Sequence, residues 1–160
     1  YLGMSDTALI EKAKKIFEDF LAKKGSRKTP ERFSVIDKLY SLPEDEHMDV
    51  EGLFLSMRNS GHTISRATIY NTLDLLVKSG LAVKHQFKDK VALYEQALTY
   101  KHHDHYVCNQ CRKIREFSDP KIKEIKASIG KDFQSEITSH SLVLYGNCLL
   151  ENCENLPKNT

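Results

Sequence analysis

Apolar side chains recur at helical spacing in several stretches of the first half of the chain. The first stripe comprises Leu9, Ala13, Ile16, Phe17, Phe20 and Leu21. Ser5 or Asp6 can cap the start of this stretch, and Gly25 suits a position just past a helix end. The pattern predicts a helix over about 6–24.

Two shorter helices follow. One opens at Thr29-Pro30-Glu31, because proline is tolerated in a first helical turn, and its apolar side comprises Phe33, Ile36, Leu39 and Tyr40. The next runs over about 49–59, and its apolar side comprises Val50, Leu53, Phe54 and Met57. Gly61 follows as a break.

A fourth helix has one apolar and one polar side. Ser65 can cap it, Gly80 can end it, and its buried side comprises Ile69, Leu73 and Leu76. Two β-rich runs come next, over 81–87 and 91–95, joined by Lys88-Asp89-Lys90 as a hairpin. Helices followed by a basic hairpin indicate a winged helix-turn-helix, whose last helix enters the major groove. A small helical domain fits the periodicity about as well.

Residues 97–101 can form a hinge between two domains, 4–96 and 102–160. The first domain is counted from Met4, since residues 1–3 resemble a cloning remnant. Strands are expected over 103–107 and 113–117, a helix from about 119 to 129, and further β structure over 133–145. The expected fold class is α+β.

Charge adds little at the level of the whole chain, whose formal net charge is +2. A local cluster of Lys23, Lys24, Arg27, Lys28 and Arg32 is opposed only by Glu31. Such a cluster is usually a solvated surface, and it can also contact phosphates. No run approaches eighteen apolar residues, so we expect no membrane span.

The segment from His102 to Cys111 contains three imidazoles, a carboxylate and two thiols. On a strand, side chains alternate between the two faces. His103 and His105 would then point to one face, and His102 and Asp104 to the other. The pattern predicts that two metal sites share this strand.

The cysteines form two pairs, Cys108 with Cys111 and Cys148 with Cys153. Four thiolates suit a closed tetrahedral zinc site. A redox dithiol or two disulfides are the alternatives, although disulfides are disfavoured in the cytoplasm, where we expect a chain without an apolar signal segment. We therefore expect structural Zn(II) that holds the C-terminal segment against the first pair.

Five motifs occur in a characteristic order: Arg66-Ala67-Thr68-Ile69-Tyr70, His102-His103-Asp104-His105 with the first cysteine pair, Glu116-Phe117-Ser118-Asp119, His140-Ser141-Leu142, and Leu144-Tyr145-Gly146. In these motifs the chain resembles the ferric uptake regulator (Fur) family of metal-dependent repressors. The resemblance implies an N-terminal winged helix-turn-helix domain and a C-terminal α/β dimerisation domain. Metal-loaded homodimers would bind double-stranded operator DNA.

The resemblance also implies which residues act. The regulatory metal, Fe(II) with Zn(II) or Mn(II) as possible substitutes, would be held by His47, Glu95, His103, His105 and Glu116. A second site would use His102, Asp104 and His140, but Lys123 stands where many relatives have glutamate, and Glu124 beside it is a possible replacement. His62 and His85 match no ligand of the family and are expected to be solvated.

The DNA-binding residues implied by the resemblance and the helix pattern are Arg27, Lys28, Ser65, Arg66, Thr68, Tyr70 and Asn71. Relatives commonly have arginine in place of Asn71, and asparagine pairs with adenine whereas arginine prefers guanine.

The expected function is a repressor that senses ferrous iron and controls iron-uptake genes. Peroxide-, zinc- or manganese-responsive regulators of the same family are alternatives. A zinc-dependent hydrolase is disfavoured, so we expect no enzyme, and a metal-buffering protein is a further class.

Overall fold

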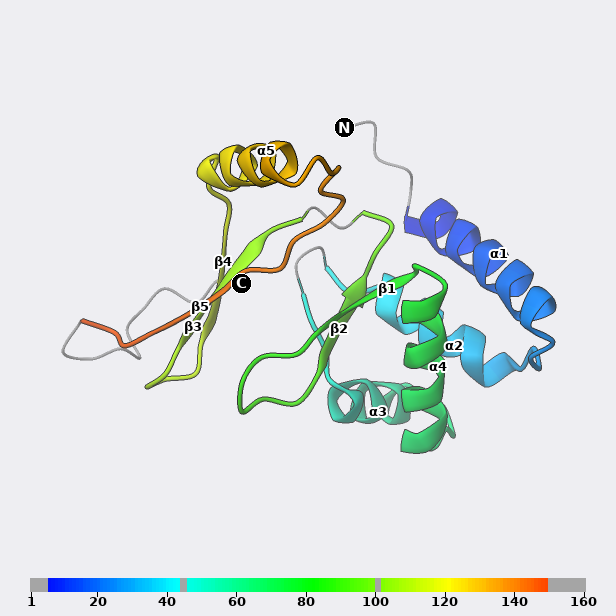
Figure 1. The fold of residues 1–160 in the computed structure, drawn as a ribbon. Coiled ribbons are helices and arrows are strands. Elements are labelled where there is room, and N and C mark those ends of the chain that lie inside the picture. Colours follow the sequence, from blue (N-terminus) through cyan, green and yellow to red (C-terminus); the bar gives the residue numbers. More distant parts are fainter. Residues whose placement is uncertain (1–5, 44–45, 100–101, 150–160) are drawn as a thin grey trace. The chain divides into compact units, whose positions relative to one another are not determined.

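The computed structural model describes residues 6–43, 46–99 and 102–149 (Figure 1). The chain divides into two compact units, Tyr1–Tyr100 and Lys101–Thr160. In the first unit four helices precede two strands, and in the second unit a helix lies in sequence between two antiparallel strands and a third strand. The fold class is α+β, as predicted.

The four helices of the first unit begin and end close to the predicted positions. They are α1 (Asp6–Lys24), α2 (Pro30–Tyr40), α3 (Val50–Asn59) and α4 (Arg66–Lys78). The Asp49 carboxylate accepts a hydrogen bond from the Gly52 amide at 2.7 Å at the start of α3. Gly25 and Gly80 have φ of +67° and +77°, which glycine adopts without strain. None of the described helices is long and apolar enough to cross a lipid bilayer.

The core of the first unit is built from the inner sides of these helices. Its fully buried side chains include Ala13, Phe17, Val35, Ile36, Leu39, Leu53, Met57, Ile69, Leu73 and Leu76. Burial of each large aliphatic side chain contributes about 1.5–3 kcal/mol. Because the inner side of α4 is buried in this way, Tyr70 and Asn71 are left exposed on its outer side.

A two-stranded antiparallel sheet completes the first unit. It consists of β1 (Ala82–His85) and β2 (Leu93–Gln96), both shorter than the predicted runs, and its connecting turn contains Asp89 at φ +56°. Met48, just before α3, bridges to Tyr94 of β2. This bridge brings the segment before α3 onto the edge of the sheet, which is decisive for the metal ligands below.

The second unit is built on a three-stranded sheet. Its elements are β3 (Asp104–Cys108), β4 (Ile114–Phe117), α5 (Lys121–Asp132) and β5 (Val143–Gly146). The strand order is β4-β3-β5, with β4 antiparallel and β5 parallel to β3. The expectation of β structure over all of 133–145 was wrong, because only its last residues form a strand. Residues 133–142 instead return the chain so that β5 can pair in parallel with β3.

Candidate metal centre

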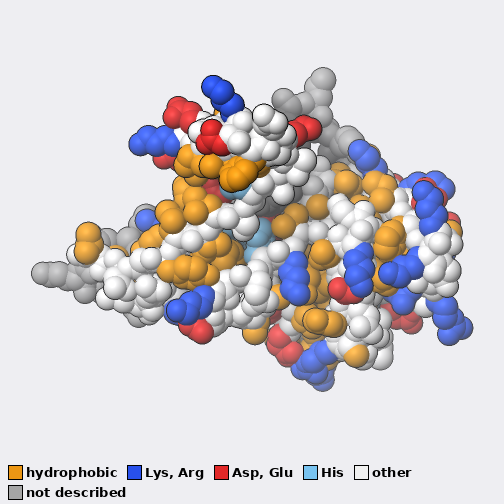
Figure 2. Space-filling view, in the orientation of Figure 1, with side chains coloured by type: hydrophobic (Ala, Val, Ile, Leu, Met, Phe, Trp, Pro, Cys, Tyr) orange, Lys and Arg blue, Asp and Glu red, His pale blue; other side chains and the backbone are white. Residues whose placement is uncertain are grey.

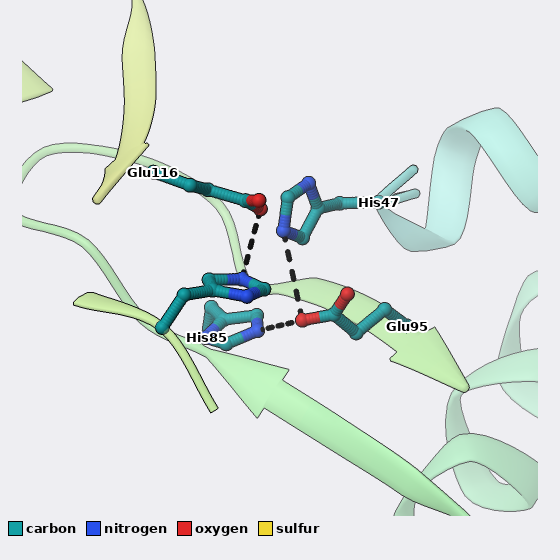
Figure 3. A network of polar contacts seen from close by, with 5 residues as sticks. His47, His85, Glu95 and Glu116 are labelled. Atoms are coloured by element: carbon teal, nitrogen blue, oxygen red, sulfur yellow. Dashed lines mark hydrogen bonds and ion pairs between the residues drawn. The ribbon is translucent and has the colours of Figure 1, made fainter. Parts of the chain in front are cut away.

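Glu95 in β2 is a buried carboxylate that lies beside two histidines (Figure 3). Its neighbour Tyr94 exchanges two backbone hydrogen bonds with Met48, at 3.0 and 2.8 Å. This bridge holds His47 next to β2, the second strand of the hairpin. Nε2 of His47 therefore lies 3.7 Å from Oε1 of Glu95.

His85 is the second histidine at this carboxylate, with Nε2 only 2.5 Å from Oε1 of Glu95. The prediction that His85 is solvated was wrong, since its side chain is 10% exposed. His85 pairs with Leu93 across the sheet, so Glu95 is its diagonal neighbour on the same face. His62, by contrast, is exposed as predicted.

The donors of this group suit a divalent metal. The ligand atoms of His47, His85 and Glu95 lie within 4.8 Å of one another. Imidazole and carboxylate are donors that Fe(II), Mn(II) and Zn(II) accept. The residues present therefore fit the metal that the sequence predicts.

In the second unit, side chains of β3 alternate between two faces as predicted. On one face, Nε2 of His103 lies 2.9 Å from the Glu116 carboxylate, the contact marked at Glu116 in Figure 3. His105 pairs with Glu116 across the sheet, and the His103 and His105 rings have centroids 5.0 Å apart. Three of the predicted regulatory ligands thus gather on one face of β3 and β4.

The opposite face carries a second group, made of His102, Asp104 and His140. Nε2 of His140 lies 3.0 Å from Oδ1 of Asp104 and 3.0 Å from Nε2 of His102. Partial burial, followed by the charge of His140, lowers the pKa of His102 and favours the neutral imidazole that binds metals. Glu124 is exposed and is not a member of this group.

Three cysteines lie at the end of the same sheet. Cys108 ends β3, Cys111 is in the turn that follows, and Cys148 lies just past β5. All three are free thiols, and Cys153 lies outside the described residues. Backbone amides, foremost that of Cys111, lower the pKa of the Cys108 thiol to about 7, which favours the thiolate that zinc requires.

Hydrogen bonds hold the segment after β5 against this turn. The Asn109 amide donates to the Gly146 carbonyl oxygen at 2.8 Å. The Cys148 amide donates to Oε1 of Gln110 at 3.0 Å. Cys148 is thus held beside the first cysteine pair, although the two cysteine segments are far apart in sequence.

The predicted DNA-binding residues lie at two places in the first unit. Arg27 and Lys28 are exposed between α1 and α2, where Nζ of Lys28 lies 2.8 Å from the Glu18 carboxylate. Ser65 caps α4 by accepting a hydrogen bond from the Thr68 amide at 3.1 Å. Ser65 therefore stabilises the start of α4, a role that does not require a contact with DNA.

The outer side of α4 carries the other residues. Tyr70 is 52% exposed, and Asn71 is exposed beside it. Arg66 forms two hydrogen bonds with the Glu51 carboxylate of α3, at 2.6 and 2.7 Å. Sequence reasoning missed Glu51, whose spacing from Arg66 carries no local signal.

Comparison with known proteins decides the family. Residues 23–145 match the model of the ferric uptake regulator family. The chain belongs to this family. Its first unit is accordingly the winged helix-turn-helix domain and its second unit the α/β domain, as predicted. Members of the Fur family are metal-dependent, DNA-binding transcription regulators and not enzymes.

Three relatives show how far the similarity extends. The ferric uptake regulation protein of Vibrio anguillarum is 32% identical over 133 residues, which cover 83% of this chain and 88% of the relative. The Helicobacter pylori Fur structure, described as having three functional metal binding sites, is 26% identical, with a TM-score of 0.74 and coverage of 88% and 91%. The Pseudomonas aeruginosa ferric uptake regulator with manganese is 29% identical, with a TM-score of 0.70 and coverage of 83% and 98%.

Proposed function

We propose that this Fur-family chain is a repressor that binds double-stranded operator DNA as a homodimer when it holds Fe(II), and that it controls iron-uptake genes. One observation carries the proposal. Each unit presents its own imidazole–carboxylate group, His47 with Glu95 in the first and His103, His105 with Glu116 in the second. Imidazole and carboxylate donors gathered in this way are typical of sites that bind divalent metals.

The proposed regulation follows from how the ligands are divided between the domains. One ion that takes ligands from both groups would favour one arrangement of the domains about a hinge at 97–101. A ligand shifts such an equilibrium only by its differential affinity for the two states. Metal binding would then select the arrangement in which a dimer matches its operator, and metal loss would release the DNA.

The type of carboxylate ligand helps to distinguish an iron sensor from a peroxide sensor. Both groups use glutamate, Glu95 and Glu116, whereas the peroxide-sensing branch implied by the family resemblance favours aspartate. Iron sensing is therefore our first assignment. Zinc and manganese remain possible occupants by donor chemistry, since imidazole and carboxylate accept all three ions.

We assign structural Zn(II) to Cys108, Cys111, Cys148 and Cys153. Support comes from the backbone amides that lower the pKa of Cys108 and from the hydrogen bond that holds Cys148 near the first pair. A closed four-thiolate site contributes to folding directly. The ion would hold the segment after β5 to the end of β3.

We assign dimerisation to the second unit. Helix α5 has no buried residue, yet it carries apolar side chains, and Phe133 at its end is 73% exposed. Figure 2 shows hydrophobic side chains gathered along α5 and over the sheet of this unit. The exposed apolar residues include Ile125, Ile129, Phe133, Leu144 and Tyr145. A symmetric dimer would bury such a surface. Operator binding would take place in the cytoplasm.

Anaerobic titration of Fe(II), Mn(II) and Zn(II) against operator binding, before and after peroxide, tests the function. Fe(II) should activate binding at a lower free concentration than Mn(II) does, as the order of affinities at imidazole and carboxylate donors predicts. His103→Ala and His105→Ala should abolish activation while zinc content and dimerisation persist, and His62→Ala, which changes an exposed histidine, is the control. Full activation of the His103→Ala variant by Fe(II) would contradict the assignment.

A further inference from the structure

His85 is the closest side chain to the Glu95 carboxylate among the contacts described above. Its Nε2 lies 2.5 Å from Oε1 of Glu95, whereas Nε2 of His47 lies 3.7 Å from the same oxygen. The Glu95 side chain is 5% exposed and that of His85 10%. A carboxylate this buried needs hydrogen-bond donors, because an unsatisfied charge in the interior is costly.

The His85 ring is held in place from several sides. Its backbone pairs with Leu93 in β2. Its ring stacks on that of Phe87, with centroids 5.8 Å apart and planes inclined by 4°, and Phe87 is itself buried. The His47 ring meets it edge-on at 5.3 Å. The imidazole therefore has little freedom to turn away from Glu95.

The contact between His85 and Glu95 has the geometry of a hydrogen bond. Nε2 of His85 faces Oε1 of Glu95, and an imidazole N–H donates to a carboxylate oxygen. A carboxylate has two oxygens, so Glu95 can accept this bond at Oε1 and offer Oε2 to a metal.

We infer that His85 is a positioning residue for the regulatory metal: its Nε2–H donates to Oε1 of Glu95 and orients the carboxylate for ligation through Oε2. This inference rests on the proposed function, in which Glu95 is a ligand. Partners that orient a ligand in this way typically change metal affinity by 10–100-fold. Phe87 contributes indirectly, because it fixes the plane of the imidazole.

Two substitutions separate the donor from the ring. His85→Phe keeps an aromatic ring against Phe87 and removes the donor. His85→Gln removes the ring and retains an amide N–H near the position of Nε2. In the full-length protein carrying His140→Ala, which impairs the second group, we would measure Co(II) affinity from its visible absorption. X-ray absorption at the cobalt edge would count the imidazole ligands.

His85→Phe should weaken Co(II) binding by about 10–100-fold with an unchanged imidazole count. His85→Gln should recover most of the affinity, and His62→Phe should have no effect. A count lower by one in His85→Phe would make His85 a ligand and overturn the inference. It is equally overturned if His85→Phe binds like the parent, or if His85→Gln is as weak as His85→Phe.

Glu95→Gln separates this inference from the proposed function. If Glu95→Gln weakens Co(II) binding and His85→Phe does not, only the role of His85 fails. If Glu95→Gln binds Co(II) like the parent, Glu95 is not a ligand, and the proposed regulatory site fails together with the role of His85. Circular dichroism of each variant would verify that it is folded.

Discussion

Arg66 at the start of α4 holds the carboxylate of Glu51 in α3 through two hydrogen bonds, at 2.6 and 2.7 Å. The guanidinium carbon also lies 3.8 Å from the centroid of the Phe54 ring. The hydrogen bonds from Arg66 lower the pKa of Glu51 and keep it ionised. A residue expected to contact DNA is thus engaged by a neighbouring helix, and an acidic group stands beside it.

Glu51→Gln should strengthen binding to all DNA sequences, by about threefold to tenfold at low salt. The substitution removes a negative charge close to the expected phosphates and releases Arg66 from its ion pair. Fluorescence anisotropy with specific and random duplexes at several salt concentrations would measure this. Glu136→Gln makes the same charge change in the second unit and is the control. An equal gain in both variants would show that only net charge matters.

Cys108→Ser should lose zinc and destabilise the second unit together, because three thiolates cannot close the tetrahedral site. Metal analysis and thermal unfolding of the purified protein would check both effects. Asn109→Ala is a matched control, since it removes the hydrogen bond from Asn109 to Asn147 beside the site and leaves every thiol. Full zinc content in Cys108→Ser would rule out this assignment.

The helices were predictable because their signals are local. The side chains of Ser65 and Asp49 cap the helices that follow them, and Gly25 and Gly80 lie just past helix ends. The alternation of ligands along β3 was predictable for the same reason, since neighbours on a strand point to opposite faces. Periodicity and capping need only a few adjacent residues.

What the sequence did not predict depends on pairing between distant segments. The late start of β5 follows from its parallel pairing with β3, which leaves 133–142 as a connection. The burial of His85 follows from its diagonal position relative to Glu95 across the hairpin. The ion pair between Arg66 and Glu51 arises from the packing of α3 against α4. No pattern among neighbouring residues predicts these contacts.

Lys123→Glu should tighten metal binding to the group of His102, Asp104 and His140, by about tenfold. The substitution places a carboxylate where many relatives have one, and removes a positive charge from α5. Calorimetric titration of Mn(II) or Co(II) in a His103→Ala background would isolate this group from the regulatory ligands.

Lys131→Glu makes the same charge change near the end of α5 and serves as the control for Lys123→Glu. Tighter binding only in Lys123→Glu would support a ligand role at this position. Equal tightening in the two variants would show that the helix acts through charge alone. An unchanged affinity in Lys123→Glu would mean that residue 123 does not approach the group.

The Tyr40 hydroxyl donates to the Leu81 carbonyl oxygen at 2.7 Å and joins α2 to the start of the wing. Burial raises the pKa of Tyr40 to about 12. The unfolded chain releases this proton near pH 10, so the associated stability is fully present below pH 10 and is lost as pH rises to about 12.

Tyr40→Phe should therefore remove part of the alkaline loss of stability, and at neutral pH it should cost about 1 kcal/mol for the lost hydrogen bond. Urea unfolding at several pH values between 7 and 11.5 would measure both effects. Tyr70→Phe, at an exposed position, is the control. An identical alkaline decline in Tyr40→Phe and the parent would contradict the role of this buried hydroxyl.

Asn71→Arg should change which operator sequence is preferred, because asparagine pairs with adenine and arginine with guanine in the major groove. Arg27→Ala should instead weaken binding to all sequences and reduce the salt slope by about one, as expected for one lost phosphate contact. A panel of mutated operators, titrated at several salt concentrations, separates the two behaviours. Both residues are exposed, so neither change should unfold the domain. If Asn71→Arg leaves the order of preference unchanged, residue 71 does not read bases, and the side of α4 that enters the groove must be reassigned.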